Sequence, residues 1–87
     1  MIYIKNNTES TQVYVNQSVN AGEYVLLQLL PENSDWDSFD DLVTAVEAGD
    51  AIASRSADES GHYADLELAI RDLTFTKNKQ LTGIASV

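Results

Sequence analysis

The spacing of apolar residues changes along this chain from a period of two to a period of about 3.6, and this change restricts the fold more than any other feature. Near the N-terminus Ile2 and Ile4 alternate with Tyr3 and Lys5, and similar alternation follows at residues 12–15. Alternation of this kind is typical of strands with one face toward a core. The sequence therefore predicts strands over residues 2–5, 12–15 and 23–30, with a loop over 16–22.

The third expected strand is apolar at both its odd and its even positions, so we expect it at the centre of the sheet or covered on both sides. Pro31 ends this strand, because proline has no N–H to give to a neighbouring strand. A short fourth strand is expected over residues 51–54, and residues 74–76 are a candidate for a final strand.

Helical spacing appears in the second half of the chain. A helix is predicted over residues 38–48, where Ser38 is suited to cap the start and Gly49 to follow the last turn. Its apolar stripe recurs at i, i+3, i+4 and i+7: Phe39, Leu42, Val43 and Val46. A second stripe predicts another helix that begins near Ser60 or Gly61: Tyr63, Leu66, Ile70 and Leu73.

Strands followed by helices indicate an α+β fold, a small antiparallel sheet of three to five strands with two helices packed on one face. Residues 1–76 are expected to form one domain, and residues 77–87 a C-terminal tail. In 87 residues without cysteine, neither a disulfide nor a thiolate metal site can reinforce the core.

Acidic residues dominate the second half of the chain. The net charge is −9, and residues 32–72 carry 12 acidic side chains against two arginines. Phosphate contacts need clustered Lys and Arg, so direct binding of nucleic acid is not expected. The charge favours either a solvated surface or a surface that meets a basic partner. No signal peptide or membrane span is expected from the N-terminal residues or from any apolar run, so the protein is expected to be made in the cytoplasm.

Catalytic and cofactor signals are weak. His62 lies near Ser60, Asp58 and Asp65 in the sequence, but proximity in sequence is not the geometry of a nucleophile, base and orienting acid. The four glycines are scattered rather than gathered in a phosphate-binding loop. The sequence therefore predicts a protein that is not an enzyme and has no cofactor.

The acidic run that begins at Asn33 partly matches the ligand pattern of a calcium loop. Asn33, Asp35 and Asp37 suit its first three ligand positions, but Ser38 stands at the glycine position and Thr44 at the final glutamate position. We therefore expect these acids to stabilise a helix start, with no metal site.

Two parts of the chain are candidates for binding other proteins. Trp36 lies between Asp35 and Asp37 in a polar segment, and Trp is enriched at binding hot spots, although it can equally fold back over the core. The second candidate is the two chain ends, the strand at residues 2–5 and the tail. Both ends are suited to pair with strands of neighbouring copies, and the alternative for the tail is a frayed terminus. The interaction residues proposed from the sequence are Trp36, Asp35, Asp37, Asp40, Asp41, Leu81, Ile84 and Val87.

Three stretches resemble small structural proteins of tailed bacteriophages. They are the opening Met1-Ile2-Tyr3-Ile4-Lys5-Asn6, the strand at residues 24–30, and the helix, turn and short strand at residues 42–52. The resemblance covers about half of the chain and includes no functional motif. It implies a virion component of the head, neck or tail that assembles with other virion proteins or with copies of itself.

An acidic inhibitor of the anti-CRISPR or anti-restriction type is the alternative class. Such a protein would imitate a row of phosphates and bind a basic nucleic-acid enzyme. The carboxylates available for this are Asp35, Asp37, Asp40, Asp41, Glu47, Asp50, Asp58 and Glu59. A cellular adaptor or an antitoxin-like domain is a third possibility that the sequence leaves open.

Overall fold

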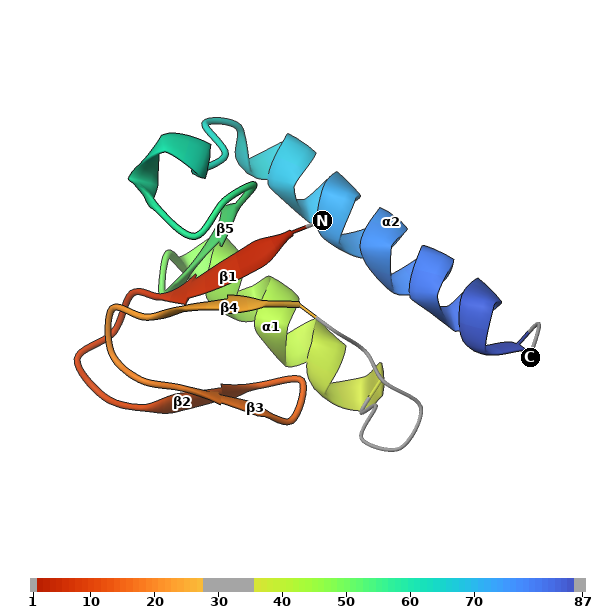
Figure 1. Ribbon diagram of the computed structural model, residues 1–87, viewed down its shortest axis with the longest axis horizontal. Helices are drawn as coiled ribbons and strands as arrows, with labels where there is room; N and C mark the ends of the chain where they lie inside the picture. Colours follow the sequence, from red (N-terminus) through yellow and green to blue (C-terminus); the bar gives the residue numbers. More distant parts are fainter. Residues whose placement is uncertain (1, 28–35, 86–87) are drawn as a thin grey trace.

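The computed structural model describes residues 2–27 and 36–85 and confirms the α+β class. Five short strands and two long helices are arranged as Figure 1 shows. In chain order they are β1 (Tyr3–Asn6), β2 (Gln12–Tyr14), β3 (Gln17–Val19), β4 (Tyr24–Leu26), α1 (Trp36–Ala48), β5 (Ala51–Ser54), a 3-10 turn (Glu59–Gly61) and α2 (Leu66–Ala85). No helix in these described ranges is both long enough and apolar enough to cross a membrane.

The main sheet has the strand order β4-β1-β5, and both pairings are antiparallel. In its register Ile4 lies opposite Val25 on one side and Ala53 on the other. Of the two expectations for the strand at residues 23–30, the central place is wrong, because β1 takes the centre of the sheet and β4 forms an edge. Residues 28–30 of that expected strand lie outside the described residues.

A separate hairpin, β2–β3, occupies part of the region that was expected to be a loop over residues 16–22. Its two turn residues, Val15 and Asn16, have φ values of 49° and 63°. Two successive positive φ values are the signature of the tight hairpin turn that matches strand twist. A β-branched residue seldom adopts this conformation, and here Val15 is held in it while its side chain is buried in the core.

Helix α1 confirms the predicted helix and begins two residues earlier than expected, at Trp36. At its C-terminal end the amide of Gly49 donates to the carbonyl of Val46, and the amide of Asp50 donates to the carbonyl of Ala45. With Gly49 at φ +83°, these bonds form a Schellman ending, which turns the chain directly into β5.

Helix α2 begins later and ends later than the sequence indicated. Asp65 caps it by accepting hydrogen bonds from the amides of Glu67 and Leu68, so the expected start near Ser60 or Gly61 is wrong. The expected strand at residues 74–76 is also wrong, because the helix continues through these residues to Ala85. The expected C-terminal tail is therefore wrong for residues 77–85, which belong to α2.

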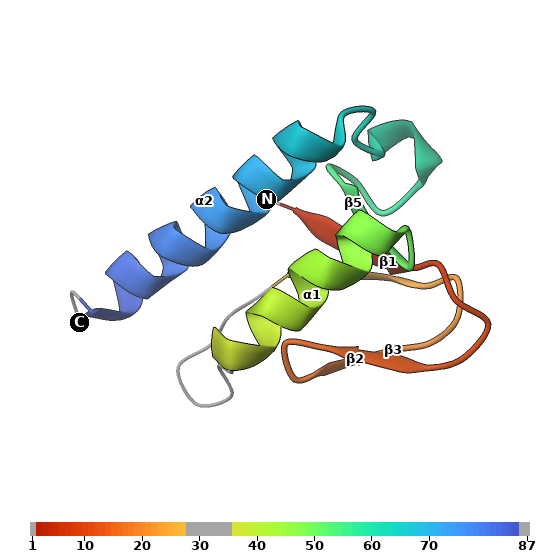
Figure 2. The same cartoon turned by 180° about the vertical axis from the view of Figure 1, so that it is seen from behind.

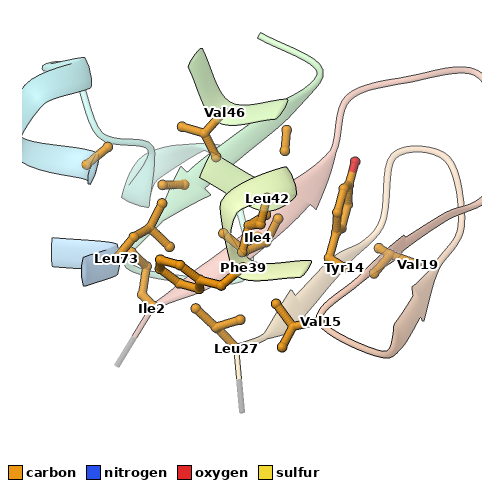
Figure 3. Packing of buried hydrophobic residues seen from close by; sticks show 13 residues of the cluster. Ile2, Ile4, Tyr14, Val15, Val19, Leu27, Phe39, Leu42, Val46 and Leu73 are labelled. Atoms are coloured by element: carbon orange, nitrogen blue, oxygen red, sulfur yellow. The ribbon is translucent and has the colours of Figure 1, made fainter. Parts of the chain in front are cut away.

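One face of the main sheet meets the helices and forms the core. Figure 2 shows α1 crossing this face, and Figure 3 shows Ile2 of the sheet side beside Phe39 of α1 and Leu73 of α2. The fully buried side chains include Ile4, Leu42 and Leu73, each at most 1 % exposed. Leu73 therefore fixes α2 to the body of the protein by apolar burial.

Candidate functional site

A ridge of exposed side chains runs along α2 on the side away from the core. Its members follow one another at intervals of four residues, and every one is exposed: Glu67, Arg71, Phe75 and Lys79. We call this set the outer ridge. Phe75 is 65 % exposed, although a phenyl ring is among the largest apolar groups in proteins. The outer ridge thus combines an exposed aromatic ring with charges of both signs.

The rotation of α2 about its own axis explains why Phe75 faces outward. Leu73 is fully buried, and a residue two positions further on is turned by about 200° around a helix of 3.6 residues per turn. Two contacts on the side of α2 that faces the core maintain this rotation of the helix. The Tyr63 hydroxyl donates to a carboxylate oxygen of Asp72 at 2.8 Å, and the Lys77 ammonium lies 4.8 Å from the centre of the Phe39 ring. Exposure of Phe75 is therefore a consequence of how the helix packs.

The direction of α2 adds to the accessibility of this surface. Figures 1 and 2 both show the helix running out from the sheet, so that the C-terminal end of α2 lies far from the sheet. The longest dimension of the protein is 37 Å, against 25 and 20 Å for the other two. A partner can approach α2 from the side of the outer ridge without meeting the sheet.

The acidic residues proposed from the sequence lie at α1. Asp40 and Asp41 are exposed, and Glu47 is exposed about two turns further along the same helix. Trp36 and Asp37 are the first two residues of α1, so Trp36 belongs to the helix rather than to a polar loop. Asp35 lies outside the described residues. The structure therefore presents part of the expected carboxylate set on one helix.

The proposed pairing of chain ends with neighbouring strands does not agree with the structure. β1 is hydrogen-bonded to β4 on one side and to β5 on the other, so it has no free edge for another strand. Leu81 and Ile84 lie in α2, whose backbone groups bond within the helix. Val87 lies outside the described residues. A contact through the C-terminal region would thus use a helix surface.

His62 joins the sheet to the 3-10 turn. Its Nε2 atom lies 2.6 Å from the Tyr24 hydroxyl of β4, and its backbone pairs with Ser54 of β5. The hydroxyl of Ser60 instead donates to Asp58, as does that of Ser56. The structure therefore pairs Ser60 with Asp58 and His62 with Tyr24 by hydrogen bonds, and these bonds hold the loop in place.

Gly61 is required where this loop crosses β5. A Cβ atom at this position would lie 2.5 Å from the backbone nitrogen of Ser56 and 2.9 Å from the Ser54 hydroxyl. The amide of Arg55 also donates to the Gly61 carbonyl at 2.7 Å. Gly61 thus marks a close approach of two chain segments, whereas the sequence suggested only a glycine near a helix start.

Asp58 gives this loop a dependence on pH. Hydrogen bonds from the Ser60 hydroxyl, the Ser56 hydroxyl and the Ser60 amide lower the pKa of the Asp58 carboxyl. Because the folded pKa is below the unfolded value of about 3.9, the stability that the ionised group contributes is present above that value and is lost as pH falls through the folded pKa.

We predict that the Ser60 amide resonance shifts on acidification with a midpoint below about 3.9, and that Asp58→Asn removes this transition. An NMR titration of both proteins checks the prediction. A midpoint above that value, or a transition that survives in Asp58→Asn, would contradict it.

A pocket of about 200 Å³ lies between the end of α1, β5 and the start of α2. The described residues around it are small or apolar apart from Tyr63, whose hydroxyl is already bonded to Asp72. Within the described ranges no group of three or more His, Asp or Glu side chains is placed to hold a metal ion. Among the described residues, the two surfaces considered for function are the outer ridge of α2 and the exposed carboxylates Asp40, Asp41 and Glu47, which we call the acidic face of α1.

The outer ridge was missed in the sequence because residues 74–76 were interpreted as a strand. The signal that was available is the four-residue spacing of Glu67, Arg71, Phe75 and Lys79.

Comparisons with protein-family models, with curated proteins and with solved structures found no match for this chain.

Proposed function

We propose that this chain is a non-enzymatic structural protein that binds other protein subunits through the outer ridge of α2. The observation that carries the proposal is Phe75, 65 % exposed on a helix whose opposite side is buried. Aromatic side chains, phenylalanine included, and arginine are enriched in protein interfaces, and Arg71 lies one helical turn from Phe75. A contact on the ridge would remove this ring from water.

The proposed partners are subunits of a virion, including further copies of this chain. The resemblance to small phage structural proteins supports this part of the proposal, together with the small size of the chain and its three-stranded main sheet. The mechanism is assembly: a folded body positions α2, and α2 presents the ridge to the next subunit. The location in a virion belongs to the same proposal.

An acidic inhibitor is the second candidate, and the exposed carboxylates of α1 favour it. Asp40, Asp41 and Glu47 are exposed on this helix, and Asp50 follows it. Such a surface would bind a basic nucleic-acid enzyme, and its affinity would fall steeply with salt because exposed charges are screened over about 8–10 Å at physiological ionic strength. The two candidates therefore use different helices.

Photo-crosslinking in the cells that make the protein tests both candidates in one experiment. A photoreactive phenylalanine analogue is placed in turn at position 75 on the outer ridge, at position 47 on the acidic face and at position 13 on the hairpin. Val13 is a matched control, because it is 67 % exposed and lies on β2, outside both helices.

We predict a protein adduct of defined mass from position 75 and no discrete adduct from position 13. An adduct from position 47 alone, lost at high salt, would support the inhibitor and contradict the assembly proposal. Equal labelling from positions 75 and 13 would show that the ridge has no special partner and would also contradict it.

A further inference from the structure

Two copies of the outer ridge that run in opposite directions would bring complementary side chains together. From the N-terminal end the ridge reads acidic, basic, aromatic and basic: Glu67, Arg71, Phe75 and Lys79. Reversing the ridge about the level of residue 73 places position 67 opposite 79 and position 71 opposite 75. The two ends then bring a carboxylate to an ammonium, and the two middle positions bring a guanidinium to a phenyl ring.

Each of these juxtapositions is a known favourable contact. Glu67 and Lys79 can form an ion pair, and an arginine guanidinium is attracted to the face of an aromatic ring. Because the relation is symmetric, both contacts occur twice. A parallel arrangement would instead place Glu67 against Glu67, Arg71 against Arg71 and Lys79 against Lys79. Of these two directions, only the antiparallel one pairs unlike charges at both ends of the ridge.

The charges of the ridge are accounted for only in part by the helix itself: Glu67 lies in the first turn of α2, where the macrodipole favours an acid, and it stands four residues before Arg71. Ion pairs for Glu67, Arg71 and Lys79 are absent among the residues that the structure describes, and all three side chains are exposed. The helix macrodipole favours cations only in the last turn, whereas Lys79 lies before that turn, which has no basic residue. The basic residue at the C-terminal end of the ridge, Lys79, thus has no requirement from the folding of a single chain.

From this order we infer that two copies of this chain pair through antiparallel α2 helices, related by a two-fold axis at the level of Leu73. The inference rests on the proposed function and names the partner on the ridge as a second copy. Since Leu73 faces inward and the ridge outward, the two folded bodies lie on opposite sides of the helix pair. The same patch serves both copies, which is the rule for two-fold interfaces.

The expected association is modest. One helix from each copy covers less area than the roughly 800 Å² per partner of a standard interface, so a dissociation constant on the order of 10 µM is expected. Three variants of the full chain test the inference by sedimentation equilibrium: Glu67→Lys, Lys79→Glu, and Glu9→Lys as a control. Glu9 is exposed outside the helices, and its variant has the same charge change as Glu67→Lys.

Glu67→Lys and Lys79→Glu should each weaken self-association about tenfold, because each places like charges together at both ends of the ridge. An equimolar mixture of the two variants should form a heterodimer of nearly wild-type affinity, and the double variant should associate with itself again. Glu9→Lys should behave like the wild type. Glu67→Lys lowers the net negative charge, so general repulsion between copies predicts stronger association, opposite to the expected result.

Failure of the mixture to restore association, or equal effects of Glu67→Lys and Glu9→Lys, would overturn the antiparallel pairing. A wild-type chain that stays monomeric at several hundred micromolar would overturn it as well. If position 75 then still crosslinks to a different protein in cells, the proposed function stands and only the self-pairing fails. An adduct of twice the chain mass from position 75 would support both.

Discussion

Replacing Asn6 with alanine is expected to lower the free energy of unfolding by about 3 kcal/mol, since each buried polar group left without a partner costs about 1–3 kcal/mol. Asn6 is 0 % exposed at the end of β1. Its amide nitrogen donates to the carbonyls of Ser10 and Val19 at 2.8 Å each. Its amide oxygen accepts from the backbone and the hydroxyl of Thr8 at 2.9 and 2.7 Å.

These four hydrogen bonds connect the central strand to the segment before β2 and to the end of β3. Alanine would leave the Val19 carbonyl buried without this donor and would release the turn at Thr8. Asn7→Ala is the matched control, because Asn7 is exposed and its side chain makes one exposed hydrogen bond, to the Gly49 carbonyl.

Chemical denaturation of the two variants checks this prediction. Asn7→Ala should change the free energy of unfolding by less than about 1 kcal/mol. Equal losses in Asn6→Ala and Asn7→Ala would show that the buried amide of Asn6 does not hold the hairpin to the sheet.

Leu73→Ala is expected to destabilise the protein by about 3 kcal/mol, within the range of about 2–5 kcal/mol observed for buried leucines. Leu73 is 0 % exposed and attaches α2 to Ile2 and Phe39, as Figure 3 shows. Phe75→Ala removes a larger side chain from the same helix, but that ring is 65 % exposed. Its effect on monomer stability should stay within about 0.5 kcal/mol.

Thermal and urea unfolding at low protein concentration measure both variants without a contribution from association. If Phe75→Ala destabilises the monomer as strongly as Leu73→Ala, then Phe75 is a core residue and the outer ridge is not an exposed surface. The pair of variants thus tests the orientation of α2 on which the proposed function depends.

Helix α1 and strand β5 could be predicted from the sequence because local signals and burial agree there. Phe39, Leu42 and Val46 form the predicted stripe and are buried in the core, and Gly49 adopts the positive φ that ends the helix. The same agreement between local preference and packing supports the α+β class as a whole.

The hairpin β2–β3 could not be predicted because its turn lacks the usual residues. Val15-Asn16 contains no glycine, and the positive φ of Val15 is maintained by tertiary packing that no local pattern shows. The hydrogen bonds of Asn6 were missed for a similar reason, since an Asn-Asn-Thr segment is equally typical of an exposed turn.

The length of α2 was missed because Thr74, Phe75 and Thr76 have strand propensity. That propensity is weaker than the burial of Leu73 and the cap at Asp65, which set the helix on one side of the segment. With the strand removed, Phe75 changes from an expected sheet residue to the exposed centre of the candidate site.

A photoreactive residue at position 75, compared with one at position 13, tests the central claim most directly. The account predicts a discrete protein adduct from position 75, made by the ring that α2 exposes, and none from position 13, which is exposed to a similar degree. No adduct from position 75, or the same diffuse labelling from both positions, would contradict the claim that the outer ridge is the surface through which this protein acts.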